Sequence, residues 1–326
     1  MCAAERSYPA RIPLKLIVVT PAGRERYLRL LAHYVLSSPQ VSAWHLWDNC
    51  RNEADRDFLH RLAASDRRCR IKKLAGASGS PSSIGEFWGF CDDADALYLR
   101  LDDDIVYIED GFFPRFIERA MAERGKAIWF APLIVNNAVC SVLLQSLSDV
   151  IIEGRITCQA MCPSSWADAE FPMALHPVLI EAARTGRLDD FRVPDREIRL
   201  SRFSINAIGL FGSDIVALGD EFCPAECTDE EEWISAVLPA RLDRPAKILG
   251  DLLVAHFSFY TQERRLLQTD ILEAYYELAG LPPHAYEKPR DRRRLKDALR
   301  LRRRRQKRHG PEYTIRLPSM RGESAP

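Results

Sequence analysis

The first part of the chain alternates between short apolar segments and longer segments whose apolar residues recur with the period of a helix. Residues 15–20, 44–47 and 70–74 predict three short β-strands. Apolar side chains spaced three and four apart predict helices over residues 24–36 and 53–64. Strands that alternate with helices are typical of an open, mostly parallel sheet flanked by helices on both faces. The sequence therefore predicts the α/β class.

A fourth predicted strand ends in three consecutive acids. Leu97, Leu99 and Leu101 share one face of an extended segment, because side chains alternate along a strand. The run Asp102-Asp103-Asp104 follows at once, and an apolar stretch resumes at Ile105. Adjacent carboxylates repel one another unless they lie in open water or around a cation. A solvated acidic turn is therefore one interpretation, and a metal site is the other.

The position of this run favours the metal site. In open α/β sheets, ligands bind at the carboxyl ends of the strands. Asp102 and Asp104 should point the same way, so both carboxylates can meet one ion. Oxygen ligands of this kind suit Mg²⁺ or Mn²⁺, and phosphates commonly complete the coordination shell. Repulsion between the acids also predicts that Asp102→Ala and Asp104→Ala leave the metal-free protein as stable as before, or more stable.

Beyond residue 131 the pattern loosens, and several prolines interrupt it. A helix followed by polar and proline-rich sequence there predicts an insertion over one edge of the sheet. The later segments regain clear patterns. In chain order we expect an insertion at 161–202 with a helix at 174–185, strands at 204–211 and 252–259, and an amphipathic helix at 262–278.

Composition describes an ordinary globular protein, with 47% hydrophobic and 28% charged residues among 326. The longest apolar stretch, residues 127–144, is interrupted by Pro132 and by Asn136-Asn137, so it predicts a strand plus a loop rather than a membrane span. The first eight residues are polar, and we expect no secretory signal.

Nine cysteines without secretory features indicate a reducing, cytoplasmic location. Two Cys-x-x-x-Cys pairs, Cys158/Cys162 and Cys223/Cys227, offer enough ligands for a four-thiolate zinc site. Their spacing is loose and no Cys-x-x-Cys occurs, so free thiols are the favoured interpretation.

A formal net charge of zero conceals an asymmetry along the chain. Residues 288–308 contain thirteen Lys and Arg against two Asp, a net charge of +11, so the rest of the chain is acidic. This segment is either a solvated helix or an attachment to an anionic membrane surface, where each basic side chain contributes about 1 kcal/mol. Interleaved aromatics are missing from it, so nucleic acid is not an expected partner.

The layout, and above all the strand that ends in Asp102-Asp103-Asp104, resembles the GT-A class of nucleotide-sugar glycosyltransferases. The resemblance implies that these acids are an Asp-x-Asp motif at the fourth strand. Asp102 and Asp104 would hold Mn²⁺ or Mg²⁺ on the donor diphosphate, and Asp102 and Asp103 would contact the nucleotide sugar. The donor would be a nucleoside-diphosphate sugar. The acceptor would be a hydroxyl of a saccharide or of a lipid-linked molecule, as in polysaccharide biosynthesis.

The resemblance also divides the chain. A GT-A-like catalytic domain would cover residues 1–282, with a nucleotide-binding half at about 12–131 and an acceptor half at about 132–282. Pro282-Pro283 would end the folded body. A basic C-terminal helix and tail would occupy 283–326, helical over 291–308 and loose over 310–326.

Further residues match places where this class binds the nucleotide. Thr20, Pro21 and Arg24 follow the first strand, where the nucleoside is cradled, although an arginine at a helix start is commonly just solvated. Asp48 ends the second strand, where the class often holds base or ribose, although a turn or helix cap explains it too. Cys50-Arg51 departs from the Asp-Asn-Gly-Ser pattern of the class.

His256 lies within an apolar strand and is a candidate third metal ligand, as a late histidine is in many members of the class. A core histidine bonded to backbone is the alternative. Asn206, on the preceding strand, is a candidate contact of the donor sugar. Trp166 and His176 lie in the insertion and are candidate acceptor contacts. A buried core residue is an equally good interpretation of Trp166.

A second acidic cluster follows Thr228. Thr228 and Glu231 have the spacing of a capping box, and acids in a first helical turn are favoured by the helix dipole. Inverting members of the class place a general base at such a helix start. Asp229, Glu230 and Glu231 are therefore candidates for the residue that deprotonates the acceptor hydroxyl.

Other functions fit parts of the pattern. A nucleotidyltransferase or another metal-dependent phosphoryl-transfer enzyme also uses acids at strand ends. Residues 21–24 partly match the glycine-rich, basic loop of nucleotidyltransferases. Phosphatases of the haloacid-dehalogenase type carry their acids on the first strand. Here that strand ends in Thr20-Pro21, which argues against this class. An inactive scaffold that acts through its basic tail is the alternative that involves no catalysis.

Overall fold

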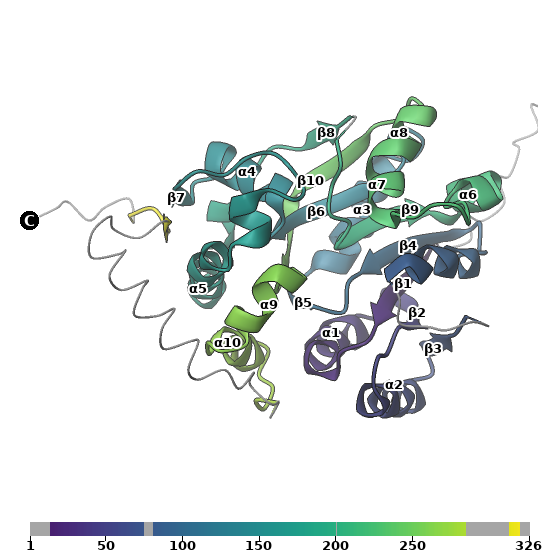
Figure 1. Cartoon of the computed structure of the whole chain (residues 1–326), viewed down its shortest axis with the longest axis horizontal. Helices are drawn as coiled ribbons and strands as arrows, with labels where there is room; N and C mark the ends of the chain where they lie inside the picture. The colour runs from purple at the N-terminus through teal and green to yellow at the C-terminus, as the bar shows by residue number, and fades with distance from the viewer. Residues whose placement is uncertain (1–13, 75–80, 200, 285–312, 320–326) are drawn as a thin grey trace, which may run out of the picture.

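A computed structural model describes residues 14–74, 81–199, 201–284 and 313–319. Its centre is a twisted nine-stranded sheet, and a separate two-stranded sheet lies at one end of the molecule (Figure 1). The strands are β1 (Lys15–Ala22), β2 (Val41–Asp48), β3 (Cys69–Lys72), β4 (Ala96–Leu101), β5 (Ile105–Ile108), β6 (Phe130–Val135), β7 (Ile151–Glu153), β8 (Arg196–Ile198), β9 (Ala207–Phe211), β10 (Ala246–His256) and β11 (Thr314–Arg316).

The strand order in the large sheet is β3-β2-β1-β4-β9-β6-β10-β5, and β8 pairs with the first residues of β10. Strands β3, β2, β1 and β4 are mutually parallel, and so are β6 and β10. Strand β9 lies between the two groups and is antiparallel to β4 and to β6. These six parallel strands therefore point the same way, which confirms the predicted α/β fold with an open, mostly parallel sheet.

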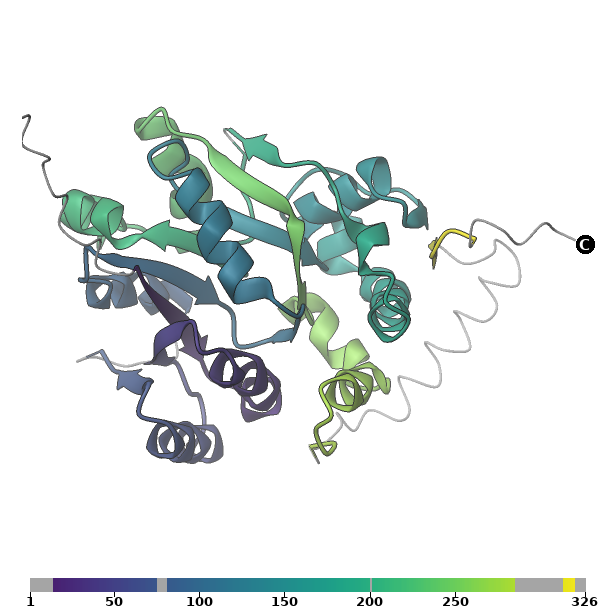
Figure 2. The same cartoon turned by 180° about the vertical axis from the view of Figure 1, so that it is seen from behind.

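Helices cover both faces of the sheet. Helix α3 lies across the face seen in Figure 2, and α7 and α8 lie over the face seen in Figure 1. The α-helices are α1 (Glu25–Ser37), α2 (Glu53–Ser65), α3 (Phe112–Ala122), α4 (Ala138–Leu147), α5 (Glu170–Arg184), α6 (Gly212–Leu218), α7 (Glu230–Glu232), α8 (Leu238–Arg241), α9 (Tyr260–Leu266) and α10 (Ile271–Leu278). Short 3₁₀ turns occupy Pro81–Phe90, Leu188–Phe191 and Gly219–Glu221, and π turns occupy Pro163–Ala167 and Trp233–Val237.

Burial explains why the central strands carry so few polar residues. All of β4 and all but the first residue of β1 are buried, as expected for strands covered on both faces. Strand β1 runs on through Pro21 and Ala22, beyond the predicted end at residue 20, because both residues still pair with β2. The strands predicted at 204–211 and 252–259 are β9 and the last part of the longer β10.

The apolar stretch 127–144 is a strand followed by a helix, not a strand and a loop. Asn137 explains the difference, since its side-chain oxygen accepts hydrogen bonds from the backbone N–H groups of Val139 and Cys140 and so caps α4. Within the described ranges, every helix is too short or too polar to cross a membrane.

The amphipathic segment 262–278 forms two helices instead of one. The Thr269 hydroxyl donates to the carbonyl of Leu266 and accepts from the N–H of Ile271, at 2.6 and 3.3 Å. These two bonds end α9 and start α10, because side-chain hydroxyls compete with helical backbone bonds. The predicted helix of the insertion is α5, which begins four residues earlier than expected and packs against α10.

The folded body does not end at Pro282-Pro283. Strand β11 pairs with β7, and Tyr313 is 8% exposed. The segment 310–326 was expected to be loose, but an open edge at β7 offers backbone partners that the local sequence does not reveal. The helix expected at 291–308 lies outside the described residues, and so does the basic segment 288–308.

Candidate active site

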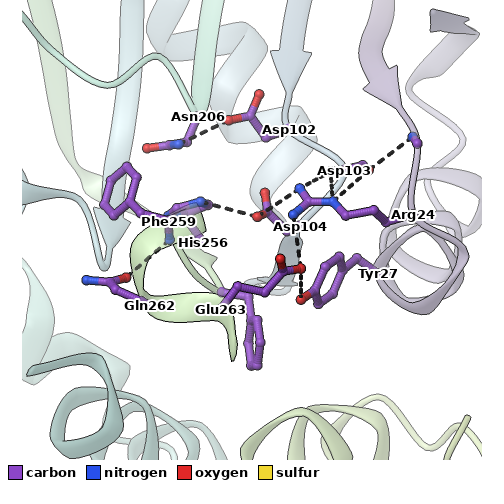
Figure 3. A network of polar contacts seen from close by, with 12 residues as sticks. Arg24, Tyr27, Asp102, Asp103, Asp104, Asn206, His256, Phe259, Gln262 and Glu263 are labelled. Carbon is purple, nitrogen blue, oxygen red and sulfur yellow. Dashed lines mark hydrogen bonds and ion pairs between the residues drawn. The ribbon is translucent and has the colours of Figure 1, made fainter. Parts of the chain in front are cut away.

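The acidic turn, Asp102-Asp103-Asp104, joins the end of β4 to β5. The Asp102 N–H donates to the carbonyl of Asn206 at 2.8 Å, and the Phe257 N–H donates to the carbonyl of Asp104 at 2.9 Å. These bonds tie the turn to the segments beside β9 and β10. Because β4 and β10 end at the same edge of the sheet, the turn meets His256, the last residue of β10 (Figure 3).

Asp102, Asp104 and His256 form the only cluster of three His, Cys, Asp or Glu side chains in the described ranges that can hold a metal ion. Their ligand atoms all lie within 4.8 Å of one another. His256 Nδ1 lies 3.2 Å from the carbonyl oxygen of Asn136, which can only accept, so Nδ1 carries the hydrogen of the neutral ring. The free Nε2 then faces Asp104 Oδ2 at 3.4 Å. Two carboxylates and an imidazole in this tautomer can bind a divalent metal ion.

Two arginines neutralise the acidic turn. Arg100 Nη1 lies 3.1 Å from Asp102 Oδ1. Arg24 pairs with Asp103, and its Nη2 lies 3.0 Å from Asp104 Oδ2. Burial alone would raise the pKa of Asp104, but Arg24 and His256 outweigh it and hold that pKa well below its usual range. Asp104 is therefore ionised at neutral pH.

The contact with Asp104 shifts the pKa of His256 in the opposite direction. Burial alone would lower the pKa of His256, but the nearby Asp104 carboxylate outweighs burial and raises it. A metal ion must then displace a proton from the ring. We therefore expect metal affinity at this site to weaken as the pH falls.

The end of β1 is held against the acidic turn. The Gly23 N–H donates to Asp103 Oδ2 at 3.1 Å. A Cβ atom at Gly23 would lie only 2.9 Å from the carbonyl oxygen of Asn49, so this close approach requires glycine. Arg24 follows directly, and its Nη1 also lies 3.4 Å from Glu263 of α9. The structure thus brings Arg24 and Asp103 to the metal cluster, as Figure 3 shows.

The other residues expected to bind the nucleotide lie at the same edge but are enclosed. Thr20 is fully buried, and its hydroxyl accepts a hydrogen bond from Trp44 Nε1 at 2.9 Å. Pro21 is buried within β1. Asp48 is 2% exposed and accepts from the N–H of Cys50 at 3.2 Å. Their contacts are those of structural residues, and nucleotide binding by them stays a prediction.

The second acidic cluster, Asp229 to Glu231, lies at the start of α7. Asp229, not Thr228, caps α7, because its carboxylate accepts from the N–H of Glu232 at 3.0 Å. Glu231 Oε1 accepts from Arg202 Nε at 2.9 Å. Burial is the main reason that the pKa of Glu231 is raised, and Arg202 only partly offsets it.

Glu230 is linked to the metal cluster through a buried arginine. Trp88 Nε1 donates to Glu230 Oε1 at 2.6 Å, and Arg100 Nη2 lies 3.6 Å from Oε2. Burial also raises the pKa of Glu230. Arg100 therefore bridges Glu230 and Asp102. Arg100, a charged residue within the apolar run 96–101, was the signal in the sequence for this bridge.

Asn206, the residue before β9, contacts the metal cluster. Its Nδ2 donates to Asp102 Oδ2 at 3.0 Å, and its Oδ1 accepts from Asn137 Nδ2 at 3.2 Å. Asn136 and Asn137, which the sequence analysis took for loop residues, thus support His256 and Asn206. Glu263 and Gln262 were missed because nothing in a helical pattern marks residues that meet a distant strand.

Trp166 and His176 have different surroundings. Trp166 is partly exposed, and its ring lies 5.3 Å from that of Tyr260. His176 is fully buried, and its nitrogens contact the Tyr275 hydroxyl at 2.7 Å and the carbonyl of Phe257 at 2.9 Å. Burial lowers the pKa of His176 to about 4. His176 is therefore placed as a structural residue, and we do not include it among the proposed acceptor contacts.

The cysteines do not assemble a zinc site within the described part of the chain. Cys158 is exposed, Cys162 is buried, and all eight cysteines described are free thiols. Free thiols were the interpretation that the sequence favoured.

Comparisons with known proteins give structural neighbours only. No family model matches the chain, and no curated protein matches it. Among solved structures, Staphylococcus aureus TarS 1–349 is 16% identical with a TM-score of 0.43, and the match covers 83% of this chain and 67% of that one. GalNAc-T7 with UDP, GalNAc and Mn²⁺ is 10% identical with a TM-score of 0.42, covering 89% and 54%.

Nucleotidyltransferases also occur among the neighbours. UTP-bound UGPase from Acinetobacter baumannii is 10% identical with a TM-score of 0.40, and the match covers 88% of this chain and 98% of that one. All these TM-scores lie below 0.5, so the function of this chain must be argued from its own residues.

Proposed function

We propose that the protein is a metal-dependent glycosyltransferase that moves a sugar from a nucleoside-diphosphate donor to a hydroxyl acceptor. The observation that carries the proposal is the meeting of Asp102, Asp104 and His256 within 4.8 Å at the ends of β4 and β10. Arg24 adds a cation beside them. This combination suits a diphosphate, whose developing negative charge must be neutralised when the sugar leaves.

Asp102, Asp104 and His256 would hold Mn²⁺ or Mg²⁺, which supplies Lewis-acid stabilisation of the leaving diphosphate. Arg24 is 32% exposed, which allows its guanidinium to reach a phosphate oxygen while Asp103 orients it. Asp103 itself is 3% exposed. Its main role would therefore be to orient Arg24, and its predicted contact with the nucleotide sugar would be secondary. Asn206 fixes Asp102 and is placed to contact the donor sugar.

We assign the general base to Glu231. Asp229 is the helix cap, and both oxygens of Glu230 face donors from Trp88 and Arg100. Glu231 is the more exposed of the two glutamates, 27% against 10%, and the hydrogen bond described for it uses Oε1 alone. Glu231 would take the proton from the acceptor hydroxyl, whose oxygen forms the new bond to the sugar as the nucleoside diphosphate leaves.

A nucleotidyltransferase is the second candidate, because Arg24 directly follows the first strand. The two reactions have different products. Glycosyl transfer releases a nucleoside diphosphate from a nucleotide sugar. Nucleotidyl transfer joins a nucleoside triphosphate to a sugar phosphate and releases pyrophosphate.

The test is a product assay with Mn²⁺ and two substrate sets. One set contains UDP-, GDP-, CDP- and dTDP-sugars, and the other contains the four nucleoside triphosphates with hexose 1-phosphates. Release of a nucleoside diphosphate from the first set, lost in Asp104→Asn, would support the proposal. Release of pyrophosphate from the second set alone would show a nucleotidyltransferase instead. If neither product forms, the inactive scaffold is the alternative that remains.

Membrane attachment through residues 288–308 stays a prediction from the sequence. The same holds for a cytoplasmic location and for a role in polysaccharide biosynthesis. An anionic surface that binds this segment would place the active site beside a lipid-linked acceptor.

A further inference from the structure

Tyr260, the first residue of α9, is the most exposed large hydrophobic side chain in the described ranges. It is 78% exposed, compared with 52% for Met161, 47% for Val216 and 37% for Leu147. The preceding ring, Phe259, is only 8% exposed. An aromatic ring kept in water beside a packed site is a candidate ligand contact, because its apolar face is left without a partner.

Packing holds this ring in place. Trp166 meets Tyr260 edge-on, with ring centroids 5.3 Å apart and an interplanar angle of 86°. The Thr261 hydroxyl donates to the carbonyl of Trp166 at 2.6 Å. The start of α9 and the π turn Pro163–Ala167 are thereby joined, so Tyr260 and Trp166 form one rigid aromatic platform. A rigid platform binds with less loss of conformational entropy than a mobile side chain.

Gln262 supports the platform through buried hydrogen bonds. It is fully buried, and its side chain makes four of them. Its Nε2 donates to the carbonyls of Ser165 and Asp168, at 3.0 and 3.3 Å. Its Oε1 accepts from Asn136 Nδ2 and from the N–H of Phe259, both at 3.1 Å. Asn136 is the residue whose carbonyl orients His256, so one network supports the metal cluster and the platform together.

A continuous path of ring contacts also joins the platform to the metal cluster. The rings of His256 and Phe259 lie 4.7 Å apart, and those of Phe259 and Trp166 lie 6.2 Å apart. In Figure 3, Gln262 and Glu263 lie on the side of His256 away from Asn206, and the Phe259 ring lies beside His256. The platform therefore borders the site at which the donor sugar would be transferred.

We propose that the Tyr260–Trp166 platform binds a pyranose ring of the acceptor, which makes the acceptor a saccharide. This inference rests on the proposed glycosyl transfer. A pyranose presents a flat face of C–H groups to an aromatic ring and hydroxyl groups at its rim. Glu263 and Asp168 are both partly exposed. Glu263 Oε1 accepts from the Tyr27 hydroxyl and Asp168 Oδ1 from the N–H of Glu170, so the second oxygen of each carboxylate would accept hydrogen bonds from such hydroxyls.

A protein partner fits this surface less well. Stable protein interfaces bury about 800 Å² on each partner, with a central apolar cluster. Here polar or charged residues, Thr261, Glu263 and Arg264, adjoin the single exposed ring on α9. A small amphipathic ligand matches the size of the platform.

The test uses the full chain with Mg²⁺ and four trisaccharide probes: chitotriose, maltotriose, cellotriose and mannotriose. Saturation-transfer NMR measures binding to wild type, Tyr260→Ala, Tyr260→Phe and the control Val216→Ala, which shortens an exposed side chain on α6. We expect at least one probe to bind wild type and the control alike. Its affinity should fall about tenfold or more in Tyr260→Ala and stay within about threefold in Tyr260→Phe, since the ring and not the hydroxyl makes the contact.

Equal binding by Tyr260→Ala would overturn the proposal. Absence of binding by every probe would also overturn it, and so would self-association of wild type that Tyr260→Ala abolishes, since that would make the platform a protein interface. Binding of UDP, GDP, CDP and ADP with Mg²⁺ is measured on the same samples. If wild type binds a nucleotide but no saccharide, the result counts against the platform alone. If wild type binds no nucleotide, the result counts against the proposed function.

Discussion

At the scale of single residues, the acidic turn shows how partners change the meaning of a motif. Read alone, three adjacent aspartates predict repulsion that a cation must relieve. In the fold, Arg100 and Arg24 already lie beside the acids, and Asp104 contacts both Arg24 and His256. The acids are therefore held in place before any metal arrives.

This arrangement reverses the stability expected of Asp104 variants. Removing a partly compensated buried charge leaves Arg24 and His256 without one of their partners. We expect Asp104→Asn to lower the free energy of unfolding by about 2 kcal/mol in metal-free buffer at pH 7, measured by urea denaturation. The control is Asp57→Asn, at an exposed position of α2. An Asp104→Asn protein as stable as wild type would mean that repulsion dominates after all.

Glu231 should set the acid limb of the pH–rate profile. The base must be ionised, and burial raises its pKa above the ordinary value of 4.5, so activity is lost as the pH falls through that raised pKa. Glu231→Gln should lower kcat about 100-fold or more and remove this limb. The neighbouring exposed Glu232→Gln should keep both the rate and the limb. A profile that Glu231→Gln leaves unchanged in shape would assign the base elsewhere.

At the scale of elements, local patterns predicted most strands and helices but not their breaks. The helices α1 and α2 lie within two residues of the predicted ranges, because their apolar periodicity and polar flanks are local properties. The division of 262–278 was not predicted, because the apolar spacing continues across Thr269 and only its hydroxyl bonds interrupt the helix. The sequence also predicted the N-cap of α7 one residue too early, at Thr228 instead of Asp229, because both residue types cap helices well.

Gln262 should be the residue on which the packing of α9 depends most. Gln262→Leu keeps the volume but leaves the carbonyls of Ser165 and Asp168 without this donor. We expect a loss of roughly 3 kcal/mol of unfolding free energy in urea denaturation. Gln159→Leu, at an exposed position, should cost little. A small effect at Gln262 would show that water replaces its bonds.

At the scale of the whole molecule, the site depends on long-range pairing that the sequence does not display. The α/β class and the acids at the end of β4 were predictable, because each is written in a continuous segment. The insertion of antiparallel β9 between β4 and β6, and the return of β10 to the same edge, bring Asn206 and His256 to those acids. Such crossings follow from the packing of the complete chain, so His256 was only a candidate before the fold was known.

The pairing of β11 with β7 makes residues near 313 part of the folded body. Tyr313 packs edge-on against Phe171, with ring centroids 5.3 Å apart. Tyr313→Ala should therefore lower the free energy of unfolding by roughly 3 kcal/mol. Urea denaturation of Tyr313→Ala and wild type is the comparison. Equal stability of Tyr313→Ala and wild type would return this segment to the loose tail that the sequence suggested.

The central claim is that Asp102, Asp104 and His256 hold a metal ion on a nucleoside diphosphate, and calorimetric titration tests it most directly. UDP, GDP, CDP and ADP are each titrated into the protein with Mn²⁺ and with EDTA. The account predicts that one of them binds with Mn²⁺, that EDTA abolishes this binding, and that Asp104→Asn abolishes it while Asp57→Asn does not. Binding that survives EDTA or Asp104→Asn, or no binding of any of the four, would contradict it.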